Sequence, residues 1–86
     1  MDIGEAVKAL KAGKAVRREG WNNPDQFVYY VPEDAYPARS TLALQVWGEG
    51  TLVPYRAYLA LKTPDGSVAT WSPSCSDTLA TDWSVV

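Results

Sequence analysis

The stretch that decides the fold is residues 55–71, which read YRAYLALKTPDGSVATW. Within residues 55–63, alternate positions would share one face of a β-strand, and that face carries Tyr55, Ala57, Leu59 and Leu61. Asp65-Gly66 is typical of a tight hairpin turn, and residues 67–71 would form the returning strand. This segment predicts an antiparallel hairpin, and the other elements are placed around it.

The N-terminal segment predicts a helix over residues 3–12. Asp2 and Glu5 have the spacing of a capping box, in which each side chain binds the other residue's backbone N–H. Gly13 provides a stop, and the apolar residues before it recur with helical period at Ile3, Ala6, Val7 and Leu10. This helix therefore presents one apolar face to the rest of the fold.

A second hairpin is expected between the helix and the middle of the chain. Residues 14–18 and 26–31 are rich in β-branched and aromatic side chains, and the turn-forming segment 19–25 separates them. Residues 32–37 begin and end with proline, and we expect them to be irregular.

Residues 38–47 are compatible with two structures. The apolar offsets favour a helix ended by Gly48, whereas Leu42, Leu44 and Val46 also fit the period of a strand over residues 42–47. We favour the helix, and the strand remains the alternative.

The C-terminal segment predicts a short helix and a last strand. Ser72-Pro73-Ser74 offers N-cap and first-turn residues for a helix through Ala80, and residues 82–86 follow as a strand. The whole chain, 1–86, is expected to form one α+β domain. It would have an antiparallel sheet of about five strands, the N-terminal helix packed on one face, and short additional helices. The other face of the sheet stays available for a partner subunit or a ligand.

Composition excludes several classes of function. The formal charge of −2 and the pI of about 4.9 argue against a general nucleic-acid or membrane-surface binder. One cysteine and no histidine leave no internal disulfide and almost no ligands for a structural metal site. Residues 1–5 are acidic and amphipathic, unlike a signal peptide, so a cytoplasmic protein is expected.

The length of the chain predicts self-association. A chain of 86 residues buries only about 60% of the surface that it exposes when unfolded, so its stability margin is thin. Neither a metal nor a cross-link is expected to supplement the core. Sharing aromatic surface between copies is the remaining way to enlarge it, which predicts a homo-oligomer.

The sequence offers few groups suited to catalysis. A Ser–His pair is excluded because the chain has no histidine, and the neighbours of Cys75 include Asp77, which disfavours a reactive thiolate. Asp77 and Asp82 could form an acid/base pair, but Asp82 is better suited to cap the turn into the last strand and Asp77 to be a solvated helix residue. We therefore expect no enzyme, no catalytic residue, no metal and no cofactor.

Aromatic residues at polar turns suggest ligand binding instead. Trp21 precedes Asn22, and Trp71 precedes the segment 72–74, so each indole has neighbours able to read hydrogen-bonding edges. Trp83 is assigned to the core, and Trp47 to the end of a helix or to an interface. Half-buried packing at the end of a strand is the alternative for Trp21 and Trp71.

Two adjacent cations precede the first of these turns. Arg17 and Arg18 point to opposite faces of their strand, so only one of them can aim at a site beside Trp21. Two solvated charges at the edge of the sheet are the alternative interpretation.

Several motifs in this order resemble one family. They are Lys11-Ala12-Gly13-Lys14 at the end of the first helix, Arg17-Arg18-Glu19-Gly20-Trp21-Asn22, Lys62-Thr63-Pro64-Asp65-Gly66-Ser67, Trp71-Ser72-Pro73-Ser74 and Asp77-Thr78-Leu79-Ala80-Thr81-Asp82-Trp83. The family was long catalogued as a domain of unknown function in phages and bacteria. Its characterised members are the second type of Thoeris anti-defence protein, and the resemblance covers essentially the whole chain.

The resemblance implies a phage-encoded sponge that binds an immune signal without cleaving it. The signal would be a cyclic ADP-ribose isomer made by a TIR-domain enzyme, and some relatives similarly bind cyclic dinucleotides. Characterised members are tetramers with pockets at subunit interfaces, so a homotetramer in the host cytoplasm is implied.

The resemblance also suggests roles for the candidate ligand-binding residues. An adenine would stack on Trp21 or Trp71, and Asn22 or Ser74 would bind its edges or the ribose. Arg17 or Arg18 would pair with the pyrophosphate. The complete expected set is Arg17, Arg18, Trp21, Asn22, Trp71, Pro73, Ser74 and Asp77.

Two departures from the family leave the ligand open. Asn23-Pro24-Asp25 stands where members often carry glycine, and Cys75 stands where they usually carry glutamine. The alternative functions are a phage structural or protein-interaction module that uses its aromatic face, and a nucleotide-processing enzyme.

Overall fold

The two expected hairpins are present and belong to one antiparallel sheet in the computed structural model, which describes residues 1–86. The sheet has five strands, β1 (Val16–Arg18), β2 (Phe27–Val31), β5 (Tyr58–Lys62), β6 (Val68–Thr70) and β7 (Trp83–Val85), in the order β6-β5-β2-β1-β7. Gly66 adopts a φ of +89°, a left-handed conformation that glycine tolerates, at the turn between β5 and β6. The predicted α+β architecture is confirmed.

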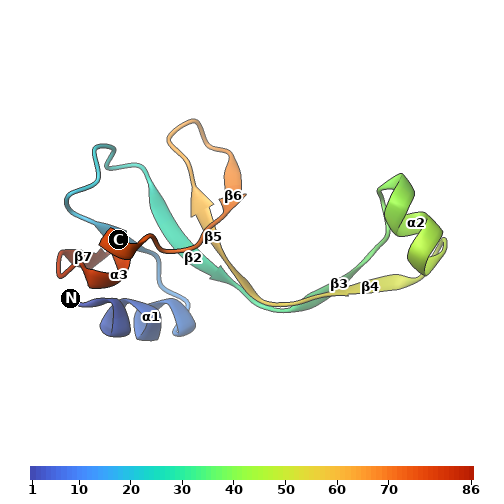
Figure 1. Cartoon of the computed structure of the whole chain (residues 1–86), viewed down its shortest axis with the longest axis horizontal. Helices are drawn as coiled ribbons and strands as arrows, with labels where there is room; N and C mark the ends of the chain where they lie inside the picture. The colour runs from blue at the N-terminus through green and yellow to red at the C-terminus, as the bar shows by residue number, and fades with distance from the viewer.

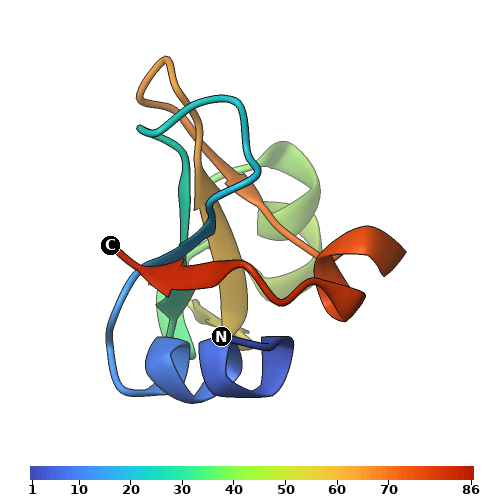
Figure 2. The same cartoon turned by 90° about the vertical axis from the view of Figure 1, so that its left-hand side faces the viewer.

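Helix α1 (Ile3–Lys11) packs against one face of this sheet and begins at the expected capping box. The Glu5 N–H donates to the Asp2 carboxylate at 2.8 Å, and the Asp2 N–H donates to the Glu5 carboxylate at 3.3 Å. The helix lies below the strands in Figure 2 and buries Ala6 and Leu10.

The core of this body is small. Ala6 and Leu10 meet Val16, Val28 and Trp83 in a single cluster of buried apolar side chains. Burying a side chain such as that of Leu10 contributes about 1.5–3 kcal/mol. Only 8 of the 86 residues are buried, so the single chain has little buried apolar surface to stabilise its fold.

The middle of the chain forms an arm that extends away from the body (Figure 1). The arm contains β3 (Asp34–Pro37), helix α2 (Thr41–Trp47) and β4 (Leu52–Tyr55), and β3 pairs with β4 in a separate two-stranded sheet. The expectation that residues 32–37 are irregular holds for residues 32–33 but was wrong for residues 34–37, which form β3. Their partner strand lies beyond α2, and no local pattern reveals that pairing.

The expected strand 55–63 is interrupted, which is a second correction. The pairs Val31↔Tyr58 and Asp34↔Tyr55 belong to one continuous register, so the arm prolongs the β2–β5 ribbon past a break. Pro32 stands opposite that break and has no N–H to donate to a ladder. Residues 52–55 therefore belong to the arm, and the sheet strand begins at Tyr58.

Helix α2 confirms the helical interpretation of residues 38–47. The Ser40 hydroxyl accepts from the Ala43 N–H at 3.2 Å, and Gly48 ends the helix with a φ of +86°. No residue of α2 is buried.

The C-terminal elements confirm the expected short helix, with one change in detail. Helix α3 (Cys75–Leu79) is capped by Ser74, whose hydroxyl accepts from the Asp77 N–H at 3.1 Å. Pro73 precedes the cap and is not part of the first turn. Trp83 is only 2% exposed, as expected for a core residue. None of the helices combines the length and the apolar character needed to cross a membrane.

Candidate functional site

Three tryptophans that lie far apart in the sequence form one cluster on the body. Trp83 lies between the other two, and its ring centroid is 5.4 Å from that of Trp21 and 5.9 Å from that of Trp71. Both contacts are edge-to-face, with interplanar angles of 78° and 82°, an arrangement that aromatic rings prefer. Trp21 and Trp71 are half-buried, so the tryptophan cluster holds them in place and leaves part of each ring exposed.

Arg18 joins the two segments that carry this cluster. Its Nη1 is 3.0 Å from a carboxylate oxygen of Asp77, and its Nε is 2.8 Å from one of Asp82. The second oxygen of Asp82 accepts from the Gly20 N–H at 2.8 Å, beside Trp21. We call Arg18, Asp77 and Asp82 the Arg18 clamp, because it fixes the Trp21 turn against α3.

The clamp changes the pKa of each of its members. The hydrogen bond with Asp82, followed by that with Asp77, raises the pKa of Arg18 above its usual value. The Arg18 guanidinium and the Gly20 N–H lower the pKa of Asp82. Burial acts to raise the pKa of Asp77, but hydrogen bonds from Arg18 and Ser74 outweigh it and leave the pKa lowered. The clamp is therefore fully charged at neutral pH.

Arg17 lies on the opposite face of β1, as the alternation of strand side chains requires. Its Nη2 approaches the carbonyl oxygens of Trp21 and Asn23 at 3.5 and 3.4 Å, and its Nε is buried without a partner. Arg18 is thus the arginine on the face of the tryptophan cluster, and Arg17 supports the turn from the other side.

The remaining expected residues border the cluster in different ways. Asn22 and Pro73 are exposed, and no side-chain hydrogen bond engages the Asn22 amide. Ser74 is exposed, but its hydroxyl already caps α3, and Asp77 binds both Arg18 and the Ser74 N–H. The fold therefore brings Trp21, Asn22, Arg18 and the segment 71–77 to one region, and leaves Arg17 behind it.

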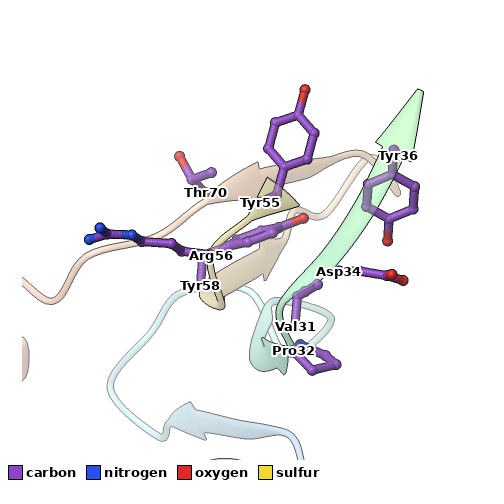
Figure 3. A pocket seen from close by; sticks show the side chains of 8 residues that line it. All are labelled: Val31, Pro32, Asp34, Tyr36, Tyr55, Arg56, Tyr58 and Thr70. Atoms are coloured by element: carbon purple, nitrogen blue, oxygen red, sulfur yellow. The ribbon is translucent and has the colours of Figure 1, made fainter. Parts of the chain in front are cut away.

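The tryptophan cluster forms an open surface on the protomer. None of the four concavities of the chain is lined by Trp21 or Trp71. One concavity, of about 430 Å³, lies at the junction of body and arm instead and is lined in part by Tyr36, Tyr55 and Tyr58 (Figure 3). Sequence reasoning missed this junction cavity. The continuous register of β2–β3 against β5–β4 brings these tyrosines together, and no local sequence pattern reveals that register.

Sequence reasoning also left the partners of Asp82 unrecognised. Asp82 was expected to cap the turn into the last strand, yet its carboxylate binds Arg18 and Gly20, which lie at the other end of the chain. A β-carbon on Gly20 would stand 2.9 Å from that carboxylate, so only glycine fits beside it without a shift. In the sequence, Gly20 was the one signal that another group approaches the backbone closely at this turn.

The fold and the tryptophan cluster define a small α+β domain with a partly exposed aromatic surface beside a charged clamp. The chain matches the family described as Thoeris anti-defense 2-like domain over residues 1–86. It is also 34% identical over 87 residues to Thoeris anti-defense 2 of Bacillus phage SP01. That alignment covers 100% of this chain and 94% of the phage SP01 protein. The chain belongs to the Thoeris anti-defense 2-like family, which confirms the resemblance and supports a phage anti-defence role.

Proposed function

We propose that this protein binds and sequesters cyclic nucleotide immune signals without cleaving them, and thereby blocks an anti-phage defence in the host cytoplasm. Cyclic ADP-ribose isomers are the first candidates, and cyclic dinucleotides are the second. The observation that carries the proposal is the pair of half-buried indoles, Trp21 and Trp71, held on either side of Trp83. Rings fixed in this way lose little conformational entropy when a base stacks on them.

The polar groups around the indoles suit the rest of such a ligand. A stacked base contributes about 1–3 kcal/mol, and the exposed Asn22 amide offers a donor and an acceptor for its edge. Arg18 uses its Nε and Nη1 in the clamp, whereas its Nη2 makes no hydrogen bond within the chain. In this proposal the Nη2 group pairs with a phosphate oxygen of the ligand.

We further propose that several copies complete the site as a homotetramer. The protomer offers the tryptophan cluster as an open surface, so a second copy is needed to enclose a ligand of this size. The arm supplies a surface for assembly, because α2 exposes Leu42, Val46 and Trp47. Burying these side chains between copies would also supplement the small core.

The direct test separates binding from turnover. The protein is incubated with a cyclic ADP-ribose isomer, freed from unbound ligand, heat-denatured, and the released molecule is identified by mass spectrometry. Recovery of the unchanged ligand in stoichiometric amount is the expected result. A linearised product would instead assign the protein to the nucleotide-processing enzymes.

A second candidate function is favoured by the exposed apolar arm. In this alternative the protein is a phage structural or protein-interaction module, and the arm docks on a different protein. It predicts no increase in melting temperature with any cyclic ADP-ribose isomer or cyclic dinucleotide. A shift with one member of that panel, abolished by Trp71→Ala, would support the sponge instead.

A further inference from the structure

The junction cavity has the composition of an aromatic cage. Tyr36 comes from β3, Tyr55 from β4 and Tyr58 from β5, and Figure 3 shows their rings on different sides of one open space. The centroids of Tyr36 and Tyr55 are 6.0 Å apart, with an interplanar angle of 49°, so the two rings are not stacked face to face. The three residues are 48%, 49% and 42% exposed, so the protomer leaves them accessible to a ligand.

One carboxylate stands at the wall of this cavity. Asp34 accepts from the Ala35 N–H at 2.8 Å, and it takes part in no ion pair, since both ion pairs of the chain belong to Arg18. Its negative charge, followed by a hydrogen bond between the two side chains, raises the pKa of the Tyr36 hydroxyl. Asp34 and its three tyrosine neighbours are called the tyrosine cage below.

The one cation of the cavity wall points elsewhere. In Figure 3 the Arg56 guanidinium extends to the side away from Tyr36 and Asp34. The guanidinium makes no ion pair with Asp34, and the cavity wall combines three tyrosine rings with that carboxylate. The negative face of an aromatic ring attracts cations, and the carboxylate adds to that attraction.

We propose that the tyrosine cage binds an organic cation of the alkylammonium class. Aromatic cages recognise ammonium groups through their ring faces, and the Asp34 carboxylate and the tyrosine hydroxyls can accept hydrogen bonds from such a group. A phosphate-bearing ligand fits less well, because Asp34 would repel it. This site is separate from the tryptophan cluster and does not depend on the function proposed for it.

Two sources can present this chemistry. One is a free polyamine, and the other is a lysine side chain of a partner protein. Both place an ammonium group at the end of an alkyl chain, which the junction cavity of about 430 Å³ has room to admit.

The first experiment isolates the role of the charge. Choline and its uncharged isostere 3,3-dimethylbutan-1-ol have the same shape, and each is titrated into the ¹⁵N-labelled protein. We expect saturable amide shifts at Ala35, Tyr36 and Tyr55 with choline, and binding about fivefold to tenfold weaker with the alcohol. Equal binding of the two compounds, or no saturable shift with choline, would overturn the proposal.

Variants then locate the site. Asp34→Asn keeps an oxygen for the Ala35 N–H but loses the charge, and Tyr55→Leu loses a ring face that Tyr55→Phe retains. Asp34→Asn and Tyr55→Leu should each weaken choline binding about fivefold, whereas Tyr55→Phe should retain it. Asp25→Asn removes an exposed carboxylate outside the cavity and is the matched control. Wild-type binding in Asp34→Asn would refute the cage.

A variant of Arg56 distinguishes a cationic ligand from a nucleotide, which is the main alternative ligand. Arg56→Gln should leave choline binding unchanged or tighten it, because the substitution removes a positive charge from the cavity wall. AMP titrated into the same variant tests the opposite chemistry. Binding of AMP at the cage amides that is weakened by Arg56→Gln would show a nucleotide site and overturn the assignment.

Two further measurements identify the source of the ammonium group and test whether the tyrosine cage is independent of the tryptophan cluster. Spermidine and Nα-acetyl-lysine amide are compared at the same amides, and tighter binding of one identifies a free polyamine or a lysine side chain as the better ligand. Choline binding should persist in Trp71→Ala. Its loss there would show that the cage is not a separate site.

Discussion

At the scale of single residues, the clamp around Arg18 connects the folding of the chain to its candidate site. Arg18 holds two carboxylates that are 59 and 64 residues away in the sequence, and one of them also binds the backbone beside Trp21. A strand arginine expected to bind a ligand thus also positions the surface that would bind it.

Acid should loosen this clamp. The folded-state pKa of Asp82 lies below its ordinary value of 3.8, so its stabilising effect is present above pH 3.8 and is lost as the pH falls through the folded pKa. The melting temperature of the wild type should therefore fall more steeply below pH 3.8 than that of Asp82→Asn. Thermal melts monitored by circular dichroism over this range measure the difference. Glu19→Gln, an exposed neighbour without a bonded side chain, is the control, and equal slopes in Asp82→Asn and wild type would contradict the prediction.

Loss of an indole should weaken ligand binding without disturbing assembly. Trp71→Ala and Trp21→Ala should each reduce affinity for the cyclic nucleotide by about fivefold or more, because one stacked base contributes about 1–3 kcal/mol. Calorimetry gives the affinity, and size-exclusion chromatography should show an unchanged oligomer. Trp71→Phe retains a stacking face and is the matched comparison. Wild-type affinity in either alanine variant would show that the indole only packs against Trp83.

At the scale of elements, local signals predicted the helices and the turns. Capping residues such as Asp2, Ser40 and Ser74 act within three residues of their partners, so their spacing in the sequence is enough to find them. The arm strands were missed or misplaced because their pairing depends on a partner beyond α2 and on the break opposite Pro32.

The contribution of the α1 cap to the free energy of unfolding can be measured. Asp2→Ala removes the carboxylate that accepts from the Glu5 N–H and should lower the free energy of unfolding by about 1 kcal/mol. Asp2→Asn retains an acceptor oxygen and should remain close to the wild type. Urea unfolding followed at 222 nm compares the three proteins, and a stability of Asp2→Ala equal to that of Asp2→Asn would refute the role of the cap.

At the scale of the whole molecule, the chain is an elongated body and arm that measure 45 × 26 × 21 Å. The arm has only Ala38 and Val53 in buried positions, so its own contacts stabilise it weakly. In the proposed homotetramer, a second copy covers the apolar helix at the end of this arm.

Charging that helix should disrupt the proposed oligomer. Leu42→Asp combined with Val46→Asp places two carboxylates on α2, and burying unpaired charges between copies is strongly unfavourable. Light scattering coupled to size-exclusion chromatography should show a smaller species with unchanged circular dichroism. Leu79→Asp is the matched control, since Leu79 is 76% exposed on the body and Leu42 is 69% exposed on the arm. An intact oligomer in the double variant would exclude α2 from the interface.

The sequence by itself determined the elements whose signals are local: α1, the choice of helix for α2, the capped α3, and both hairpins of the sheet. It also indicated the family through the order of its motifs. Each of these depends on side chains within a few positions of one another, where propensity, capping and periodicity act directly.

Only the tertiary structure decided which distant residues meet. It placed Trp21 and Trp71 on either side of Trp83, directed Arg18 to Asp77 and Asp82, and paired β3 with β4 so that three tyrosines surround one cavity. These contacts depend on how strands pair and which face each side chain takes. Many pairings satisfy the same local pattern, and the packing of the whole chain selects one of them.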